Sequence, residues 1–191
     1  DGTLPELMDM VRLATFMFAA GQDTSAKLLA NSMKYISEEP GLQQQIREDT
    51  SLIPAFIEEV LRLEGSTKAT FRIARRDTQI GDYKIPAGKK VTLALAAANR
   101  DPRVWENPDE FRLKRPRIKQ HLAFGRGIHT CAGNPLARVE VKVILEYFFD
   151  KTSHITLSEE KHGPLGKRRL DYEPSFIIRG LSNLYVDLVP A

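Results

Sequence analysis

The only cysteine of the chain, Cys131, lies in a glycine-rich segment that could carry redox chemistry. Residues 124–133 read Phe-Gly-Arg-Gly-Ile-His-Thr-Cys-Ala-Gly, and apolar periodicity after them predicts a helix. Backbone N–H groups and the positive end of the helix dipole favour a negatively charged sulfur at this position. The three glycines let the backbone approach a flat, bulky partner closely. A thiolate facing such a partner indicates a haem iron with a sulfur axial ligand, which favours cleavage of the O–O bond.

A lone cysteine is more often a buried structural thiol than a metal ligand. The surrounding glycines, together with Phe124 and His129, favour the ligand interpretation here. Phe124 is expected to pack against the macrocycle beside the sulfur. The N–H groups of Gly127 and Gly133, which flank the cysteine, are expected to donate hydrogen bonds to it and to tune the iron's redox potential.

A second segment with unusual residues lies in a predicted long helix. Residues 19–25 read Ala-Ala-Gly-Gln-Asp-Thr-Ser, and Gly, Asp and Thr each weaken a helix interior by roughly 0.5–1 kcal/mol relative to Ala. One interpretation is a kink or a helix end. The functional interpretation is a groove for oxygen activation, in which Gly21 leaves room for a small ligand, Thr24 offers a hydroxyl group and Asp23 passes protons.

Both segments resemble those of the cytochrome P-450 family, the haem-thiolate monooxygenases. The first matches Phe-x-x-Gly-x-x-x-Cys-x-Gly and the second matches Ala-Gly-x-Asp-Thr-Ser/Thr, while His129, Leu136-Ala137-Arg138 and Glu140 resemble the soluble bacterial branch. The resemblance implies haem b (iron protoporphyrin IX) bound through Cys131 as metal ligand, and catalytic proton transfer by Asp23 and Thr24. It further implies that Arg72 and His129 bind the haem propionates. The other residues it places at the cofactor are Ala20, Gly21, Phe124, Gly125 and Gly133.

A third feature is the Glu59-x-x-Arg62 pair, whose members share a helical face. By itself such a pair is most often an exposed ion pair. It resembles the family's Glu-x-x-Arg element, which implies a third, structural member at Arg115, after Pro108-Asp109-Glu110-Phe111. If the triad is buried, losing one partner would strand a charge at a cost of roughly 3–5 kcal/mol. The remaining histidines, His121, His154 and His162, show no metal-ligand spacing and are interpreted as ordinary.

The elements expected to position these residues define the fold class. The sequence predicts helices from Leu4 to about Ser37, from Leu42 to Glu48, after Asp49, and from Leu136. The helix after Asp49 should place Ile53, Phe56, Ile57, Val60 and Leu61 on one apolar face. Residues 13–20 should cross a core, and Leu136, Val139, Val143, Ile144, Tyr147 and Phe148 should form one apolar face. Residues 69–95 predict a small mixed sheet, residues 100–123 an irregular meander, and residues 175–178 and 184–189 short strands. The prediction is a mainly α protein with small mixed β-sheets (α+β), containing the family's long central helix, Glu-x-x-Arg helix, meander, cysteine loop and following helix.

Composition limits the partners. The chain has 191 residues and a net charge of +3, a mild balance that does not by itself suggest nucleic acid. One cysteine excludes an internal disulfide. The longest apolar run, residues 13–20, is far short of the ~20 residues that a membrane span needs, and no signal peptide is visible. The resemblance corresponds to the family's C-terminal half, so residues 1–191 are interpreted as the C-terminal haem-binding part, with the N-terminal half of the same enzyme absent.

The resemblance implies a cytoplasmic enzyme that hydroxylates an apolar or amphipathic small molecule with O2, using electrons from a ferredoxin-type donor and its reductase. Substrate contacts are expected from Ala19, Ala20, Thr67, Ala69, Phe176 and Ile177. A basic cluster around the cysteine loop is either a docking surface for an acidic electron-transfer protein or a solvated face. The cluster comprises Arg103, Lys114, Arg115, Arg117, Lys119, Arg126, Arg138 and Lys142. Three alternatives stay open: a haem-binding sensor or carrier, which would not need Asp23 and Thr24; a cysteine hydrolase; and an inactive fragment of the enzyme.

Overall fold

The computed structural model describes residues 4–191 and is dominated by helices. The helices are α1 (Leu7–Glu38), α2 (Pro40–Glu48), α3 (Ile53–Glu64), α4 (Leu95–Ala98), α5 (Asn134–Lys151) and α6 (Glu159–His162). The strands are β1 (Thr70–Ile73), β2 (Thr78–Ile80), β3 (Tyr83–Ile85), β4 (Lys90–Leu93), β5 (Thr152–Leu157) and β6 (Val186–Pro190). The predicted α+β class with its long helix and irregular meander is confirmed.

The strands form three two-stranded antiparallel sheets, pairing β1 with β4, β2 with β3, and β5 with β6. The predicted mixed pairing is therefore corrected: the connections between residues 70 and 93 are too short for the crossover that parallel strands need. The predicted strand at residues 175–178 is also wrong. That segment makes only an isolated bridge between Ile178 and Thr67.

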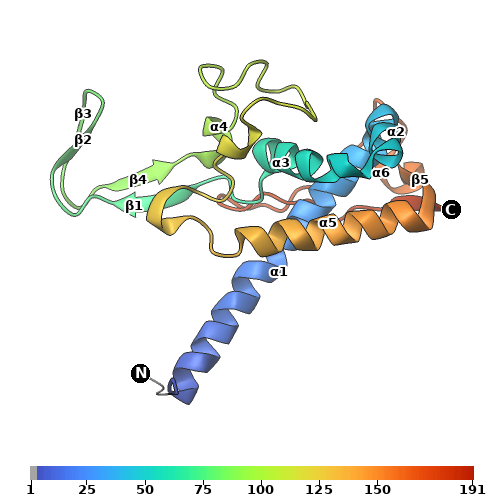
Figure 1. The fold of residues 1–191 in the computed structure, drawn as a ribbon. Helices are drawn as coiled ribbons and strands as arrows, with labels where there is room; N and C mark the ends of the chain where they lie inside the picture. The colour runs from blue at the N-terminus through green and yellow to red at the C-terminus, as the bar shows by residue number, and fades with distance from the viewer. Residues whose placement is uncertain (1–3) are drawn as a thin grey trace.

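The core lies where the C-terminal half of α1 packs against α3 and α5 (Figure 1). The apolar positions predicted for α3 are all buried, because they recur at helical spacing on the side facing α1 and α5. Asp49 caps the turn that precedes α3, accepting a hydrogen bond from the Ser51 backbone N–H (3.0 Å). Pro54 lies in the first turn of α3, where a backbone N–H would have no partner within the helix, so the missing N–H of proline costs no hydrogen bond. This helix is therefore a fixed platform for the charged residues it carries.

Two predictions of buried surface were wrong. The first turns of α1 extend away from the body of the molecule (Figure 1), and Leu13, Phe16 and Phe18 are 59%, 68% and 70% exposed. In α5 the buried residues are Val141, Leu145 and Phe149 rather than the predicted face. That helix is apolar on two sides, and only one of them meets α1 and α3. Most of the predicted face is exposed, namely Leu136, Val139, Val143, Ile144 and Tyr147.

Over residues 4–191, none of the helices combines the length and the apolar character that crossing a membrane requires.

Candidate functional site

The cysteine loop, α1 and the β1–β4 sheet enclose an open cavity of about 970 Å³. This size is at the upper end of what small-molecule and cofactor sites occupy. The wall combines apolar side chains with a few polar groups. Among the residues of interest from the sequence, it contains Ala20, Thr24, Thr67, Arg72, Phe124, Gly125, His129 and Cys131.

The cysteine loop is closed by a backbone hydrogen bond from the Cys131 N–H to the Phe124 carbonyl oxygen (2.9 Å). Gly125 and Gly127 have φ angles of +69° and +80°, a left-handed conformation that side chains disfavour. These two glycines therefore make the tight reversal that brings Cys131 back beside Phe124. The Cys131 side chain is exposed and contributes to the cavity wall, three residues before α5 begins. A Cβ built at Gly133 would lie 3.8 Å from its sulfur.

Two candidate partners for a carboxylate share this cavity with the sulfur. Arg72 lies on β1, opposite Val91 of β4, and donates one hydrogen bond from Nη1 to the Phe71 carbonyl oxygen (2.8 Å). His129 ends the short helical turn Gly127–His129 within the cysteine loop. Arg103 and Arg126, which the sequence placed in the basic cluster around the cysteine loop, also line the cavity. The site is therefore rich in cationic side chains around an exposed thiol.

The segment with Gly21, Asp23 and Thr24 is helical throughout, so the interpretation as a helix end is wrong. The Thr24 hydroxyl donates to the Ala20 carbonyl oxygen (2.8 Å), which satisfies it within the helix. Ala20 and Thr24 face the cavity, whereas Gly21 and Asp23 are not part of its wall. The Asp23 carboxylate instead pairs with the ammonium group of Lys27, one turn along α1.

Lys27 is a buried lysine that joins α1 to the C-terminal tail. Its Nζ also pairs with the Glu173 carboxylate (2.9 Å), and a Cβ built at Gly180 would overlap its methylene chain. Burial alone would lower the pKa of Lys27, but hydrogen bonds to Asp23 and Glu173 outweigh it and raise that pKa. Lys27 thus stays charged and holds the orientation of Asp23.

The Glu59 carboxylate forms the predicted triad in a fully buried position. It accepts hydrogen bonds from Arg62 Nε and Nη2 (2.9 and 2.8 Å) and from Arg115 Nε (2.8 Å). The Arg62 and Glu59 side chains are 0% exposed. The interpretation of this pair as an exposed ion pair is therefore wrong. Arg62 also donates from Nη1 to the Asn99 carbonyl oxygen (2.9 Å). The Asn99 amide oxygen accepts the Leu122 N–H (2.7 Å), which links the triad to the start of the cysteine loop.

A second buried network was missed from the sequence, where His121 was interpreted as ordinary. His121 Nε2 lies 3.0 Å from Oε2 of Glu58, and Arg138 Nη2 donates to the same oxygen (3.1 Å). Burial alone would raise the pKa of Glu58, but the hydrogen bonds from His121 and Arg138 outweigh it and lower that pKa to about 2. The signal in the sequence was the double carboxylate Glu58-Glu59 on the buried face of one helix. His162 is likewise buried, accepting the Tyr185 N–H at Nε2 (2.9 Å).

These features match a known family. The family model for cytochrome P450 matches residues 3–166. The chain belongs to the cytochrome P450 family. Its fold is that of P450 CYP150A6 from Mycobacterium marinum in the substrate-free form, with 50% identity and a TM-score of 0.96 over 100% of this chain and 47% of that one.

Two further relatives extend the comparison. Cytochrome P450 144 from Mycobacterium tuberculosis is 39% identical over 83% of this chain and 36% of its own length. CYP109E1 from Bacillus megaterium, solved in complex with corticosterone, is 29% identical with a TM-score of 0.87, over 97% of this chain and 48% of that one. The P450 chain therefore spans less than half the length of these relatives.

The P450 family implies a haem, and the residues of the cavity fit one. An exposed thiol in a glycine-rich loop suits an axial ligand of iron, because no side chain crowds the approach of a flat ring. Arg72 and His129 line the same wall and supply donors for carboxylates. The cavity is thus chemically matched to a planar group that bears a metal and two carboxylates.

The predicted substrate contacts are divided between the cavity and its surroundings. Thr67 lines the P450 cavity, whereas Ala19, Ala69, Phe176 and Ile177 do not. Ala69 is buried, and the ring of Phe176 stacks on Phe71 with centroids 6.2 Å apart. The Ile177 carbonyl oxygen accepts the Lys68 N–H (2.7 Å). The tail segment therefore braces the strand that carries Arg72.

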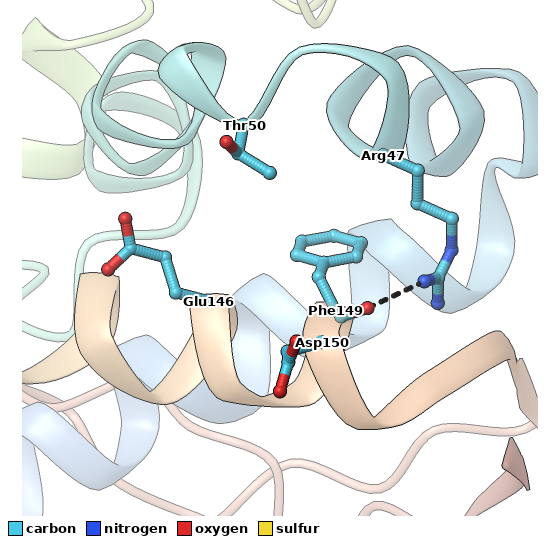
Figure 2. A pocket seen from close by; sticks show the side chains of 5 residues that line it. All are labelled: Arg47, Thr50, Glu146, Phe149 and Asp150. Atoms are coloured by element: carbon cyan, nitrogen blue, oxygen red, sulfur yellow. Dashed lines mark hydrogen bonds between the residues drawn. The ribbon is translucent and has the colours of Figure 1, made fainter. Parts of the chain in front are cut away.

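A separate cavity of about 470 Å³ lies between α2 and α5 (Figure 2). Arg47 is its cationic group, and Nη1 donates to the carbonyl oxygens of Phe149 (3.2 Å) and Thr152 (2.5 Å). These carbonyl groups belong to the end of α5, where unpaired carbonyls and the negative end of the helix dipole attract a cation. Arg47 is therefore committed to capping α5.

Proposed function

We propose that residues 1–191 form the C-terminal haem-binding part of a P450 monooxygenase that binds haem b through the sulfur of Cys131. The observation that carries this proposal is that one cavity wall contains Cys131, Arg72, His129 and Thr24. These residues come from three separate segments: the cysteine loop, β1 and α1. Membership of the P450 family supports the same assignment.

Thiolate-bound haem supplies the capacity to activate O2 and cleave its O–O bond. In this proposal the Cys131 sulfur would hold the iron, and Phe124 would pack beside the sulfur. Arg72 and His129 hydrogen-bond the two propionates and fix the ring's orientation. On the α1 side the cavity wall is formed by Ala20 and Thr24, and Gly21 is not part of it.

Proton delivery is assigned to Asp23 and Thr24. Thr24 lines the cavity, so its hydroxyl group would be the proton donor on the cavity side. In the structure the Thr24 hydroxyl group donates its proton to the Ala20 carbonyl oxygen. Rotation about the Cβ–Oγ1 bond would turn the proton toward the cavity. Asp23, the preceding residue, is held by Lys27 outside the wall and would restore the proton from the solvent side.

The proposed substrate is an apolar or amphipathic small molecule, oxidised at a C–H bond with O2. The cavity supports this class, because most of its lining surface is apolar and includes Ile80, Val91, Leu93 and Leu95. The relative CYP109E1 was solved with corticosterone, a molecule of that kind. Thr67 is the substrate contact that the cavity favours.

The N-terminal half of the enzyme is the proposed partner of the two exposed apolar faces. Leu13, Phe16 and Phe18 of α1, with Leu136 and Val139 of α5, are each more than half exposed. Large apolar side chains gathered on the exposed face of a helix are typical of an interface. The relatives are more than twice as long as this chain, which supports the same arrangement.

The proposed electron donor is a ferredoxin-type protein, reduced by its own reductase. Arg115 and Arg138 turn inward to Glu59 and Glu58, so they are removed from the suggested docking cluster. Four of the remaining cations are exposed beside the cysteine loop and suit an acidic partner. They are Lys114, Arg117, Lys119 and Arg126.

The test uses the full-length enzyme, reduced and exposed to CO. Thiolate ligation gives a strongly red-shifted Soret band, which is expected in the wild type and should be lost in Cys131→Ser. Product formation from an apolar substrate with a ferredoxin and its reductase then tests the oxygenase activity. An unshifted band in the wild type would contradict the proposal, and a shifted band without turnover of any substrate would favour a haem-binding sensor.

A further inference from the structure

Glu58 contacts both sides of the cysteine loop. Its Oε2 atom lies 3.0 Å from Nε2 of His121, ten residues before Cys131. Its Oε1 atom accepts from Nε of Arg138, seven residues after Cys131, at 2.5 Å. One carboxylate therefore joins the chain that enters the loop to the helix that leaves it.

The two partners of Glu58 contact the loop residues directly. The Ala123 N–H donates to His121 Nδ1 (3.2 Å), so the ring proton lies on Nε2 and points to Glu58. The Arg138 guanidinium group lies 4.6 Å from the centroid of the Phe124 ring. Phe124 in turn accepts the Cys131 N–H at its carbonyl oxygen. The Arg138 arm thus ends on Phe124, which hydrogen-bonds Cys131, and the His121 arm ends on the preceding residue, Ala123.

Burial makes these contacts strong and specific. The side chains of Glu58 and His121 are 7% and 2% exposed, and that of Arg138 is 31% exposed. Hydrogen bonds to an ionised carboxylate in such surroundings are about twice as strong as neutral ones. Glu58 also lies on α3, which is buried in the core. Its contacts therefore fix the position of the cysteine loop relative to the core.

The neighbouring carboxylate has a different set of partners. Glu59 binds Arg62 and Arg115, and it also accepts the Arg112 backbone N–H (3.1 Å), all of which involve α3 and the meander. It reaches the cysteine loop only through Asn99. Two adjacent residues of one helix therefore hold different segments: Glu59 binds the meander, and Glu58 binds the two sides of the cysteine loop.

We propose that Glu58 is a positioning residue for the Cys131 sulfur, acting through His121 and Arg138. This inference rests on the proposed haem-thiolate function. Loss of the carboxylate removes the contacts that join His121 to Arg138. Residues 121–124 then move more freely, which weakens the hydrogen bond between Cys131 and Phe124. The sulfur then exchanges more readily between its ligating position and others, while the core around α3 stays intact.

The experiment compares Glu58→Gln with Glu146→Gln in the full-length holoenzyme. The control removes a carboxylate of α5 that pairs only with Lys142 at the surface (2.7 Å). Hydrogen exchange is followed at the amides of Ala123 and Cys131 in the resting enzyme. Glu58→Gln should raise both exchange rates about tenfold or more, the effect of losing one charged hydrogen bond. Exchange at Leu61 in the middle of α3 should rise by no more than the loss of unfolding free energy measured by denaturant accounts for.

The second readout is the CO complex. The red-shifted Soret band should convert to the unshifted form about tenfold faster in Glu58→Gln than in the wild type or the control. Arg138→Lys, which keeps the charge but loses the forked contact with Glu58, should fall between them and replaces Glu58→Gln if that variant does not fold. Wild-type rates in both variants would overturn the inference, whereas a wild-type enzyme without the red-shifted band would overturn the proposed function instead.

Discussion

Lys27 and Asp23 form an ion pair one turn apart on α1, and the lysine of this pair is buried. The same ammonium group pairs with Glu173 of the tail. The carboxylates of Asp23 and Glu173 therefore both stabilise the charge of Lys27. Of the two, only Asp23 is adjacent to Thr24 at the cavity. This difference separates a structural role of the carboxylates from a role in proton transfer.

Asp23→Asn should slow product formation about 100-fold or more and increase the solvent isotope effect, because a general acid or base is lost. Glu173→Gln is the matched control, since it removes the other carboxylate from Lys27. Both variants should lose a similar, small amount of stability, up to about 1 kcal/mol. Turnover with a substrate and the thermal midpoint measure the two effects. Equal loss of turnover in the two variants would assign Asp23 a structural role only.

Thr24→Ala should uncouple electron consumption from product formation while haem stays bound. The hydroxyl group that delivers a proton at the cavity is lost, but no contact to the cysteine loop changes. Thr15→Ala is the matched control, because Thr15 makes the same hydrogen bond within α1, to the Val11 carbonyl oxygen at 2.8 Å. The ratio of product to NAD(P)H consumed measures the coupling. A wild-type ratio in Thr24→Ala would argue against the proton-delivery role.

The sequence predicted the features that depend on local spacing. The apolar face of α3, the Glu59–Arg62 pair and the cysteine loop each follow from residues a few positions apart, and each forms as predicted. A turn of helix or a left-handed glycine is decided by neighbouring residues, so a pattern in the chain is enough to recognise it.

Apart from the contact of Arg115 with Glu59, which the family resemblance implied, the contacts between distant segments were not predicted. Nothing in the spacing of Glu58, His121 and Arg138 indicates that they meet, because their approach depends on how α3 and α5 pack. The same holds for Lys27 and Glu173, which are far apart in the chain. The buried face of α5 was mistaken for the same reason: both sides of the helix are apolar, and the packing of α1 and α3 selects Leu145 rather than Val143.

Arg62→Ala should lower the free energy of unfolding by about 3–5 kcal/mol, because it leaves the Glu59 carboxylate buried without its main partner. Arg12→Ala is the control: Arg12 pairs with Asp9 at an exposed position of α1, and its loss should cost no more than about 0.5 kcal/mol. Denaturant unfolding followed by circular dichroism measures both variants. A loss of less than 1 kcal/mol in Arg62→Ala would contradict the role of the triad in stability.

The free energy of unfolding should depend on pH through the Glu58 carboxylate. Its pKa is about 2 in the folded protein, below the ordinary value of 4.5, so its contribution is present above pH 4.5 and is lost as the pH falls toward 2. Between pH 6 and pH 3 the difference in unfolding free energy between the wild type and Glu58→Gln should shrink by about 2 kcal/mol. Denaturant midpoints measured from pH 6 down to pH 3 follow the trend. A constant difference would mean that Glu58 is not held ionised by His121 and Arg138.

Gly180→Ala should displace Lys27, because the new Cβ would overlap the Lys27 Cγ, Cδ and Cε atoms. The overcrowding should cost about 1–3 kcal/mol of stability. In a Lys27→Ala background the methylene chain is gone, so the same substitution should cost little, and the double-mutant cycle should give a coupling energy of at least about 1 kcal/mol. Gly41→Ala, where a Cβ meets nothing within 4 Å, is the control and should be neutral or stabilising. If the cost of Gly180→Ala were the same in both backgrounds, the tail would not be held against α1 through Lys27, and Asp23 would have to be oriented by other contacts.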